Sequence, residues 1–153
     1  MFQLALASLH LIALGIGLGA VINRGAALRE VPDERSLRRV FRADTLWGIA
    51  AMLWIGTGLW RYLGEVDKTV AYYNGNYFFL AKMTLLALIL ALEIWPMVML
   101  VRWRMAIRRG GSAGVIAVPG TARILATISH LQALLVVFMV FAAAAMARGY
   151  QTL

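Results

Sequence analysis

Four long apolar runs dominate the chain, and short polar connections separate them. The runs cover residues 2–22, 45–63, 78–101 and 122–147. A helix that crosses a bilayer needs about 20 apolar residues, and it closes its backbone hydrogen bonds within itself. We therefore predict an all-α fold: a single integral membrane domain over residues 1–153, built as a four-transmembrane-helix bundle. The first run follows Met1 without a basic segment, so we expect it to be retained as a helix rather than cleaved as a signal peptide.

The composition excludes an ordinary soluble domain. The chain is 62% hydrophobic and 14% charged, whereas soluble domains average about 45–50% and about 25%. It has no cysteine, which excludes a disulfide framework, a thiolate zinc site and an iron–sulfur cluster. The net charge of +8 would suggest nucleic acid as the partner of a soluble protein. Here orientation in a membrane explains the arginines better, so we expect the lipid bilayer as partner and no nucleic acid.

The basic residues are unevenly divided among the three connections. The second connection carries Lys68, with Arg61 at its border, and the other two are rich in arginine. By the positive-inside rule, these two arginine-rich connections face the cytoplasm, and both termini face outward. The arginines concerned are Arg24, Arg29, Arg35, Arg38, Arg39 and Arg42 in the first connection, and Arg102, Arg104, Arg108, Arg109 and Arg123 in the third.

The first connection also predicts a short amphipathic helix. Residues 32–34 read Pro-Asp-Glu, a typical helix start with acids in the first turn. Leu37 and Phe41 then share one face, while Arg38 and Arg42 would lie on the membrane surface near anionic lipid.

Small residues predict where the helices approach one another. Gly15 and Gly19 form a small-xxx-small pair on the first run, with Gly17 between them. Gly56 and Gly58 have a similar role on the second run, and alanines at 142–145 and 147 give the fourth a smooth face. Such residues let helix backbones approach closely in lipid. The alternative is that they clear space beside a large planar ligand. Pro96, inside the third run, predicts a bend because it removes a backbone hydrogen bond.

Ionisable residues inside apolar runs are the best candidates for function, because they are costly in a membrane. At about 1.5 Å per residue, His10 lies roughly 12 Å and Lys82 roughly 6 Å below the outer surface. Arg148 caps the outer end of the fourth run. His10 is either a buried imidazole bonded within the bundle or a haem ligand, for which histidine is the usual choice. Lys82 is either an interfacial side chain that reaches outward or a partner for a ligand carboxylate.

Glu93 and His130 fall at a second, deeper level. Both lie near the inner third of the membrane, so we predict that they pair across the third and fourth helices. That pair is either a structural hydrogen bond or part of a proton relay. His10 and His130 are about 14 Å apart along the membrane normal, so they are not expected to ligate the same haem iron, whose bonds to nitrogen are near 2 Å.

Several motifs together resemble a known family. Residues 9–15 (LHLIALG), 42–48 (RADTLWG), 81–83 (AKM) and 146–150 (MARGY) are similar to a bacterial family of predicted four-helix inner-membrane proteins of unknown function. The resemblance covers nearly the whole chain. It implies a multi-pass protein of the bacterial cytoplasmic (inner) membrane, and it implies no activity.

A second resemblance is to the HemJ-type protoporphyrinogen oxidases and the CopD-like membrane proteins. It consists of the Leu-His step at His10 and the Ala-Lys step at Lys82. In HemJ proteins the corresponding residues are thought to matter for haem binding and activity, which the resemblance implies here. The chain departs from HemJ by lacking a Tyr-Leu-Pro-Arg run after the first helix and a further histidine on the third.

Two functional hypotheses follow. In the first, the outer half binds b-type haem or another tetrapyrrole for membrane redox chemistry, with quinone or porphyrinogen as the reaction partner. His10 would ligate the haem iron, either with a second ligand other than His130 or with none, and Lys82 and Arg148 would hold the propionates by charge. In the second, the protein binds no cofactor and is a non-enzymatic accessory subunit packed against a larger membrane complex. The protein partners we consider are such a complex or further copies of this chain, and a homo-oligomer with no other partner would count against the second hypothesis.

Overall fold

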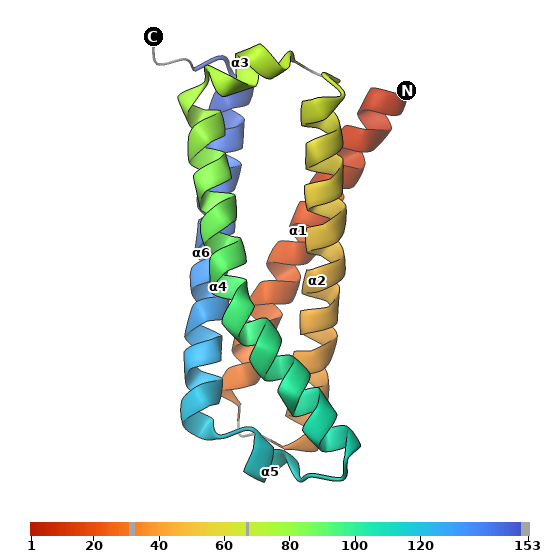
Figure 1. The fold of residues 1–153 in the computed structure, drawn as a ribbon, viewed down its shortest axis with the longest axis vertical. Coiled ribbons are helices and arrows are strands. Elements are labelled where there is room, and N and C mark those ends of the chain that lie inside the picture. The colour runs from red at the N-terminus through yellow and green to blue at the C-terminus, as the bar shows by residue number, and fades with distance from the viewer. Residues whose placement is uncertain (31–32, 67, 151–153) are drawn as a thin grey trace.

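Four long helices lie side by side in the computed structural model, which describes residues 1–30, 33–66 and 68–150. They are α1 (Phe2–Arg29), α2 (Glu34–Leu63), α4 (Tyr77–Arg108) and α6 (Pro119–Ala147), with two short helices, α3 (Val70–Asn74) and α5 (Ala113–Ile116). Figure 1 shows α3 at one end of the molecule and α5 at the other, and we call these the α3 end and the α5 end. Helix α1 starts and α6 ends at the α3 end.

The prediction of an all-α fold is confirmed, since helices are the only regular elements in the described part of the chain. Within that part, α1, α4 and α6 are long and apolar enough to cross a membrane. Helix α2 is not among them, because its run 45–63 holds three tryptophans and three glycines, which are less hydropathic than aliphatic residues. The count of four membrane spans therefore stays a prediction.

The helices extend beyond the predicted runs at the α5 end. The predicted helix start is confirmed, since α2 begins at Glu34 with Asp33 as its N-cap, but the prediction of a short separate helix on the membrane surface is wrong. Its residues form the first turns of α2, which continues to Leu63 without a break. The start is a capping box, in which the Ser36 N–H donates to Asp33 Oδ1 at 2.6 Å and the Asp33 N–H donates to Ser36 Oγ at 3.1 Å. The hydrogen bond from the Ser36 N–H to the carboxylate lowers the pKa of Asp33. Leu37 is buried, so this face packs on the protein interior.

Helix α4 changes direction near its middle (Figure 1). Pro96 lies inside α4 and has no N–H to donate to the carbonyl oxygen of Leu92, so a bend is expected there. Towards the α5 end, α4 comes close to α2, where Arg104 Nη2 donates to the Phe41 carbonyl oxygen at 2.8 Å. Towards the α3 end the two helices stand apart (Figure 1).

Of the glycines singled out from the sequence, Gly17 and Gly58 permit close packing, whereas Gly15, Gly19 and Gly56 do not. A Cβ added at Gly15 or Gly19 would meet nothing within 4 Å. Gly17, between them, faces α2, where a Cβ would lie 3.4 Å from the Cβ of Ala50. On α2, Gly58 faces α1, and a Cβ there would lie 3.1 Å from His10 Cε1. The interpretation of Gly15 and Gly19 as a packing surface is therefore wrong, because their side of α1 faces away from α2.

Candidate functional site

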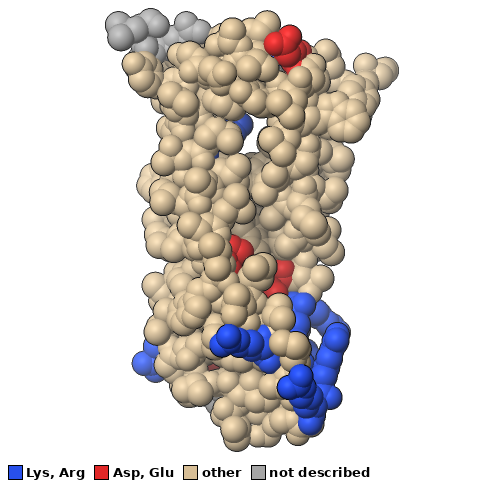
Figure 2. All heavy atoms as spheres, in the orientation of Figure 1, with Lys and Arg blue, Asp and Glu red and all other residues tan. Residues whose placement is uncertain are grey.

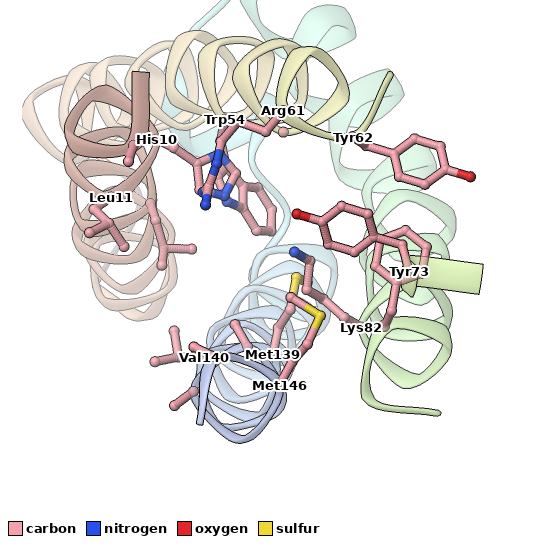
Figure 3. A pocket seen from close by; sticks show the side chains of 17 residues that line it. His10, Leu11, Trp54, Arg61, Tyr62, Tyr73, Lys82, Met139, Val140 and Met146 are labelled. Atoms are coloured by element: carbon pink, nitrogen blue, oxygen red, sulfur yellow. The ribbon is translucent and has the colours of Figure 1, made fainter. Parts of the chain in front are cut away.

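A cavity lies between the four long helices at the α3 end. It has a volume of about 350 Å³ and adjoins a second cavity of about 180 Å³, and His10, Trp54, Lys82 and Met139 line both. In Figure 2 the surface is hollowed at this level, between α2 and α4. Figure 3 shows that His10 and Lys82 reach the cavity from different helices, α1 and α4. The two residues predicted to share the outer half of the protein thus line one space.

The His10 ring is held by α2. Its Nδ1 lies 2.9 Å from Thr57 Oγ1. The single hydroxyl proton of Thr57 goes to the carbonyl oxygen of Leu53 at 2.7 Å, so Oγ1 accepts from His10. The hydrogen-bond network therefore assigns the proton to Nδ1 and the lone pair to Nε2. A ring oriented through one nitrogen in this way is typical of metal-ligating histidines.

Lys82 supplies a positive charge on the opposite wall. Its side chain is half-buried, and its ammonium lies 6.0 Å from the ring centroid of Phe79. No hydrogen bond or ion pair of Lys82 is found among the described residues. Arg61, from α2, also lines the cavity. Arg148 does not, because it is the exposed residue that ends α6.

The remaining wall is apolar or aromatic. Tyr62 stacks on Phe79, with ring centroids 5.2 Å apart, and Figure 3 shows the sulfur atoms of Met139 and Met146 near Lys82. The alanine face of α6 contributes through residues 143, 144 and 147. No Asp or Glu is among the described residues that line either cavity. The site thus combines an oriented imidazole and two cationic side chains with apolar walls.

A second polar cluster lies closer to the α5 end, and Arg24 is at its centre. Arg24 is fully buried, with 0% of its surface exposed. Its Nη1 donates to Asp44 Oδ1 at 2.9 Å and to Glu93 Oε1 at 2.7 Å. Its Nη2 donates to Glu93 Oε2 at 2.8 Å and to Gln132 Oε1 at 2.7 Å. Its Nε donates to Ser129 Oγ at 3.0 Å.

These contacts use all five N–H donors of a guanidinium, and they join α1 to α2, α4 and α6. Arg104 Nη2 completes the cluster by donating to Asp44 Oδ2 at 2.9 Å. Two arginines thus face two carboxylates, and the cluster is neutral overall. A network with every Arg24 donor satisfied fixes how the four helices fit together, so we interpret it as structural.

Glu93 and His130 do not pair with each other in the structure. The carboxylate of Glu93 is held by Arg24 and Gln132. The Nδ1 of His130 lies 2.6 Å from the carbonyl oxygen of Ala126, one turn earlier in α6. The predicted pair is therefore wrong, because His130 and Gln132 project from different sides of α6 and only Gln132 faces Glu93.

The sequence interpretation missed Arg24, which it assigned to a solvent-facing connection. One signal was available: Ala13, Gly17, Ala20 and Arg24 follow one another at helical spacing. This stripe is the face of α1 that is buried. A second signal was Glu93 itself, a lone acid in an apolar run that requires a cationic partner.

Within the described residues, no three His, Asp or Glu side chains come together as ligands for a metal ion. The candidate ligand site is thus the cavity at the α3 end, where one histidine is available. Compared with known proteins, residues 2–151 match the family model described as "Predicted membrane protein (DUF2214)". The search of curated proteins and the search of solved structures found no match.

Proposed function

We propose that this chain, which belongs to the DUF2214 family of predicted membrane proteins, binds a tetrapyrrole such as haem b in the cavity at its α3 end. One observation carries the proposal. The same apolar cavity is lined by an imidazole whose Nδ1 is already engaged by Thr57 and by a lysine that has no described hydrogen bond or ion pair. The proposed role is in membrane redox chemistry.

The residues present fit such a ligand. The volumes of about 350 and 180 Å³ lie in or near the range of small-molecule sites, about 300–1,000 Å³. A tetrapyrrole has a broad apolar body and carboxylate side chains, and the cavity matches these with aromatic and methionine walls and with Lys82 and Arg61. The absence of acids among the described lining residues removes a source of repulsion for carboxylates.

Each residue has a distinct role in this proposal. His10 offers the lone pair of Nε2 to iron, and Thr57 fixes the plane of its ring. Lys82 binds a carboxylate by a charge-assisted hydrogen bond, which Arg61 supplements. The apolar walls exclude water. When bound, haem supplies one-electron chemistry, while the protein supplies binding, orientation and electrostatics.

We also propose that all four long helices cross the membrane, with both termini outside. Helix α2 packs along α1, and its Asp44 is tied to Arg24 inside the cluster, which supports α2 crossing with α1, α4 and α6. In Figure 2 most of the visible Lys and Arg atoms gather at the α5 end, which the positive-inside rule assigns to the cytoplasm. The cavity would then lie in the outer half of the bilayer.

The experiment is a titration of the purified protein in detergent with haemin and, separately, with metal-free protoporphyrin. Binding is measured from the Soret band and from the quenching of tryptophan fluorescence. H10A should weaken haemin binding and leave protoporphyrin binding nearly unchanged, because only haemin carries iron. K82Q should weaken both by about 10- to 150-fold, the loss of a charge-assisted hydrogen bond of about 1.5–3 kcal/mol.

Matched controls exist in the chain. H130A removes the other histidine, and R148Q removes a cation near the same end that does not line the cavity. Both should bind haemin and protoporphyrin like the parent protein. If neither porphyrin binds, or if H130A and H10A behave alike, the proposal is wrong.

Two other hypotheses from the sequence receive no support of this kind. A proton relay through Glu93 and His130 has no described path, because the two side chains have separate partners. The accessory-subunit hypothesis and the resemblance to HemJ stay predictions, since no contact or surface favours either one.

A further inference from the structure

A groove at the α5 end combines basic and apolar residues. It lies between α2 and α4, has a volume of about 660 Å³, and is lined by four arginines: Arg38, Arg42, Arg104 and Arg108. No Asp or Glu is among its described lining residues. Two of these arginines have acidic partners outside the groove lining: Arg104 pairs with Asp44, and Arg38 pairs with Glu34 at 3.3 Å. Arg42 and Arg108 have no described ion pair, so the groove keeps positive charge available to a ligand.

The arginines differ in how they are held. Arg104 is fixed through Nη2 to Phe41, Asp44 and Thr45, and its guanidinium lies 5.2 Å from the ring centroid of Phe41. Its Nε is buried without a hydrogen-bond partner in the described structure. Arg42 and Arg108 are exposed and have no described ion pair. The groove thus holds Arg104 in a fixed position, and the long, exposed side chains of Arg42 and Arg108 flank it and can reach a bound anion.

Apolar residues continue the groove away from the arginines along α2. Arg38, Arg42 and Leu46 follow one another at intervals of four residues and share a helix face. Leu46 and Ile49, further along this wall, are 47% and 48% exposed. A ligand that lies along this face would meet guanidinium groups at one end and aliphatic side chains at the other.

We propose that this groove binds an anionic phospholipid, with its phosphate between Arg42, Arg104 and Arg108 and an acyl chain along Leu46 and Ile49. Arginine recognises phosphate through bidentate hydrogen bonds, and basic pockets between membrane helices bind anionic lipid headgroups. The site is at the opposite end of the molecule from the tetrapyrrole cavity, so neither proposal depends on the other.

The test is native mass spectrometry of the full chain in detergent, with phosphatidylglycerol and phosphatidylcholine of identical acyl chains. The first phosphatidylglycerol should bind about 10- to 100-fold more tightly than phosphatidylcholine. The double variant R42Q/R108Q should lose this preference. Arg104 is left unchanged, because its contact with Asp44 contributes to folding.

The matched control is R35Q/R102Q, which removes the same charge from exposed positions on the same two helices outside the groove. It should keep the preference for phosphatidylglycerol. Equal loss in both double variants would mean that the attraction is general surface charge, and the proposal would be wrong. Displacement of the lipid by an equal concentration of inorganic phosphate would also overturn it, since the site would then select a free anion.

Discussion

Replacing Arg24 by glutamine tests whether the buried cluster holds the helices together. Arg24 is fully buried, while the side chains of Asp44 and Glu93 are 16% and 20% exposed. R24Q would leave two carboxylates facing the single charge of Arg104, and a glutamine has two N–H donors where Arg24 uses five. Removing one partner of a buried ion pair costs about 3–5 kcal/mol.

For a chain of this length, about 1 kcal/mol shifts the unfolding midpoint by about 2–4 °C. We therefore expect R24Q to lower the apparent Tm by roughly 6–20 °C. The assay is thermal unfolding in detergent, followed by circular dichroism and by loss of the monodisperse peak in size-exclusion chromatography. R29Q is the control, because Arg29 is an exposed residue of the same helix and surface changes stay within about 0.5 kcal/mol.

A double-mutant cycle with E93Q separates the ion pair from general disruption. In R24Q/E93Q the remaining charges, Asp44 and Arg104, balance each other, so the double variant should be more stable than the sum of the two single losses indicates. The coupling free energy between Arg24 and Glu93 should be about 0.5–3 kcal/mol, as for other residues in direct contact. If R24Q and R29Q unfold at the same temperature, or if the cycle shows strict additivity, the assignment of a structural role to this cluster is wrong.

Two further predictions concern single positions. A Cβ at Gly25 would lie 2.5 Å from His130 Cε1, so G25A should lower the free energy of unfolding by about 1–3 kcal/mol through overpacking. Adding H130A to G25A should restore the Tm. The control G19A, which has open space around the added Cβ, should leave the Tm unchanged. D33A should lower the Tm by removing the N-cap of α2. Because the pKa of Asp33 is lowered in the fold, its contribution is present above the unfolded-state pKa and is lost as the pH falls through the folded-state pKa. A Tm difference between D33A and the parent that persists unchanged in strong acid would contradict this reasoning.

The length of the apolar runs predicted the all-α fold and the approximate position of every long helix. The helix ends were less predictable from the apolar runs. A helix continues into a polar stretch of sequence where the apolar residues of that stretch are buried on one face. Leu37 and Val40 show this, since they pack in the interior and carry α2 well beyond its apolar run.

For the candidate site, depth along a helix was predictable and rotation about its axis was not. Each residue advances a helix by about 1.5 Å, which is why His10 and Lys82 were expected at similar depths and line one cavity. The same arithmetic placed Glu93 and His130 at one level. It could not show that His130 turns towards Gly25, whereas Gln132 turns towards Glu93.

Arg148 illustrates the same limit at the cavity. It ends α6 at the expected height, but its position on the exposed side of that helix end leaves it outside the lining, where Arg61 of α2 is found. A single sequence gives no direct information on which neighbouring helix a side chain faces. The packing of small residues such as Gly17 and Gly58 decides this, and it is visible only in three dimensions.

The most direct test of the central claim is the absorption spectrum of dithionite-reduced protein, purified from cells supplied with haem. We predict a Soret band of bound haem in the parent protein and in H130A, with the band lost or strongly shifted in H10A. Parent protein that purifies folded and without a Soret band, or an H10A spectrum identical to that of the parent, would contradict a haem site built on His10.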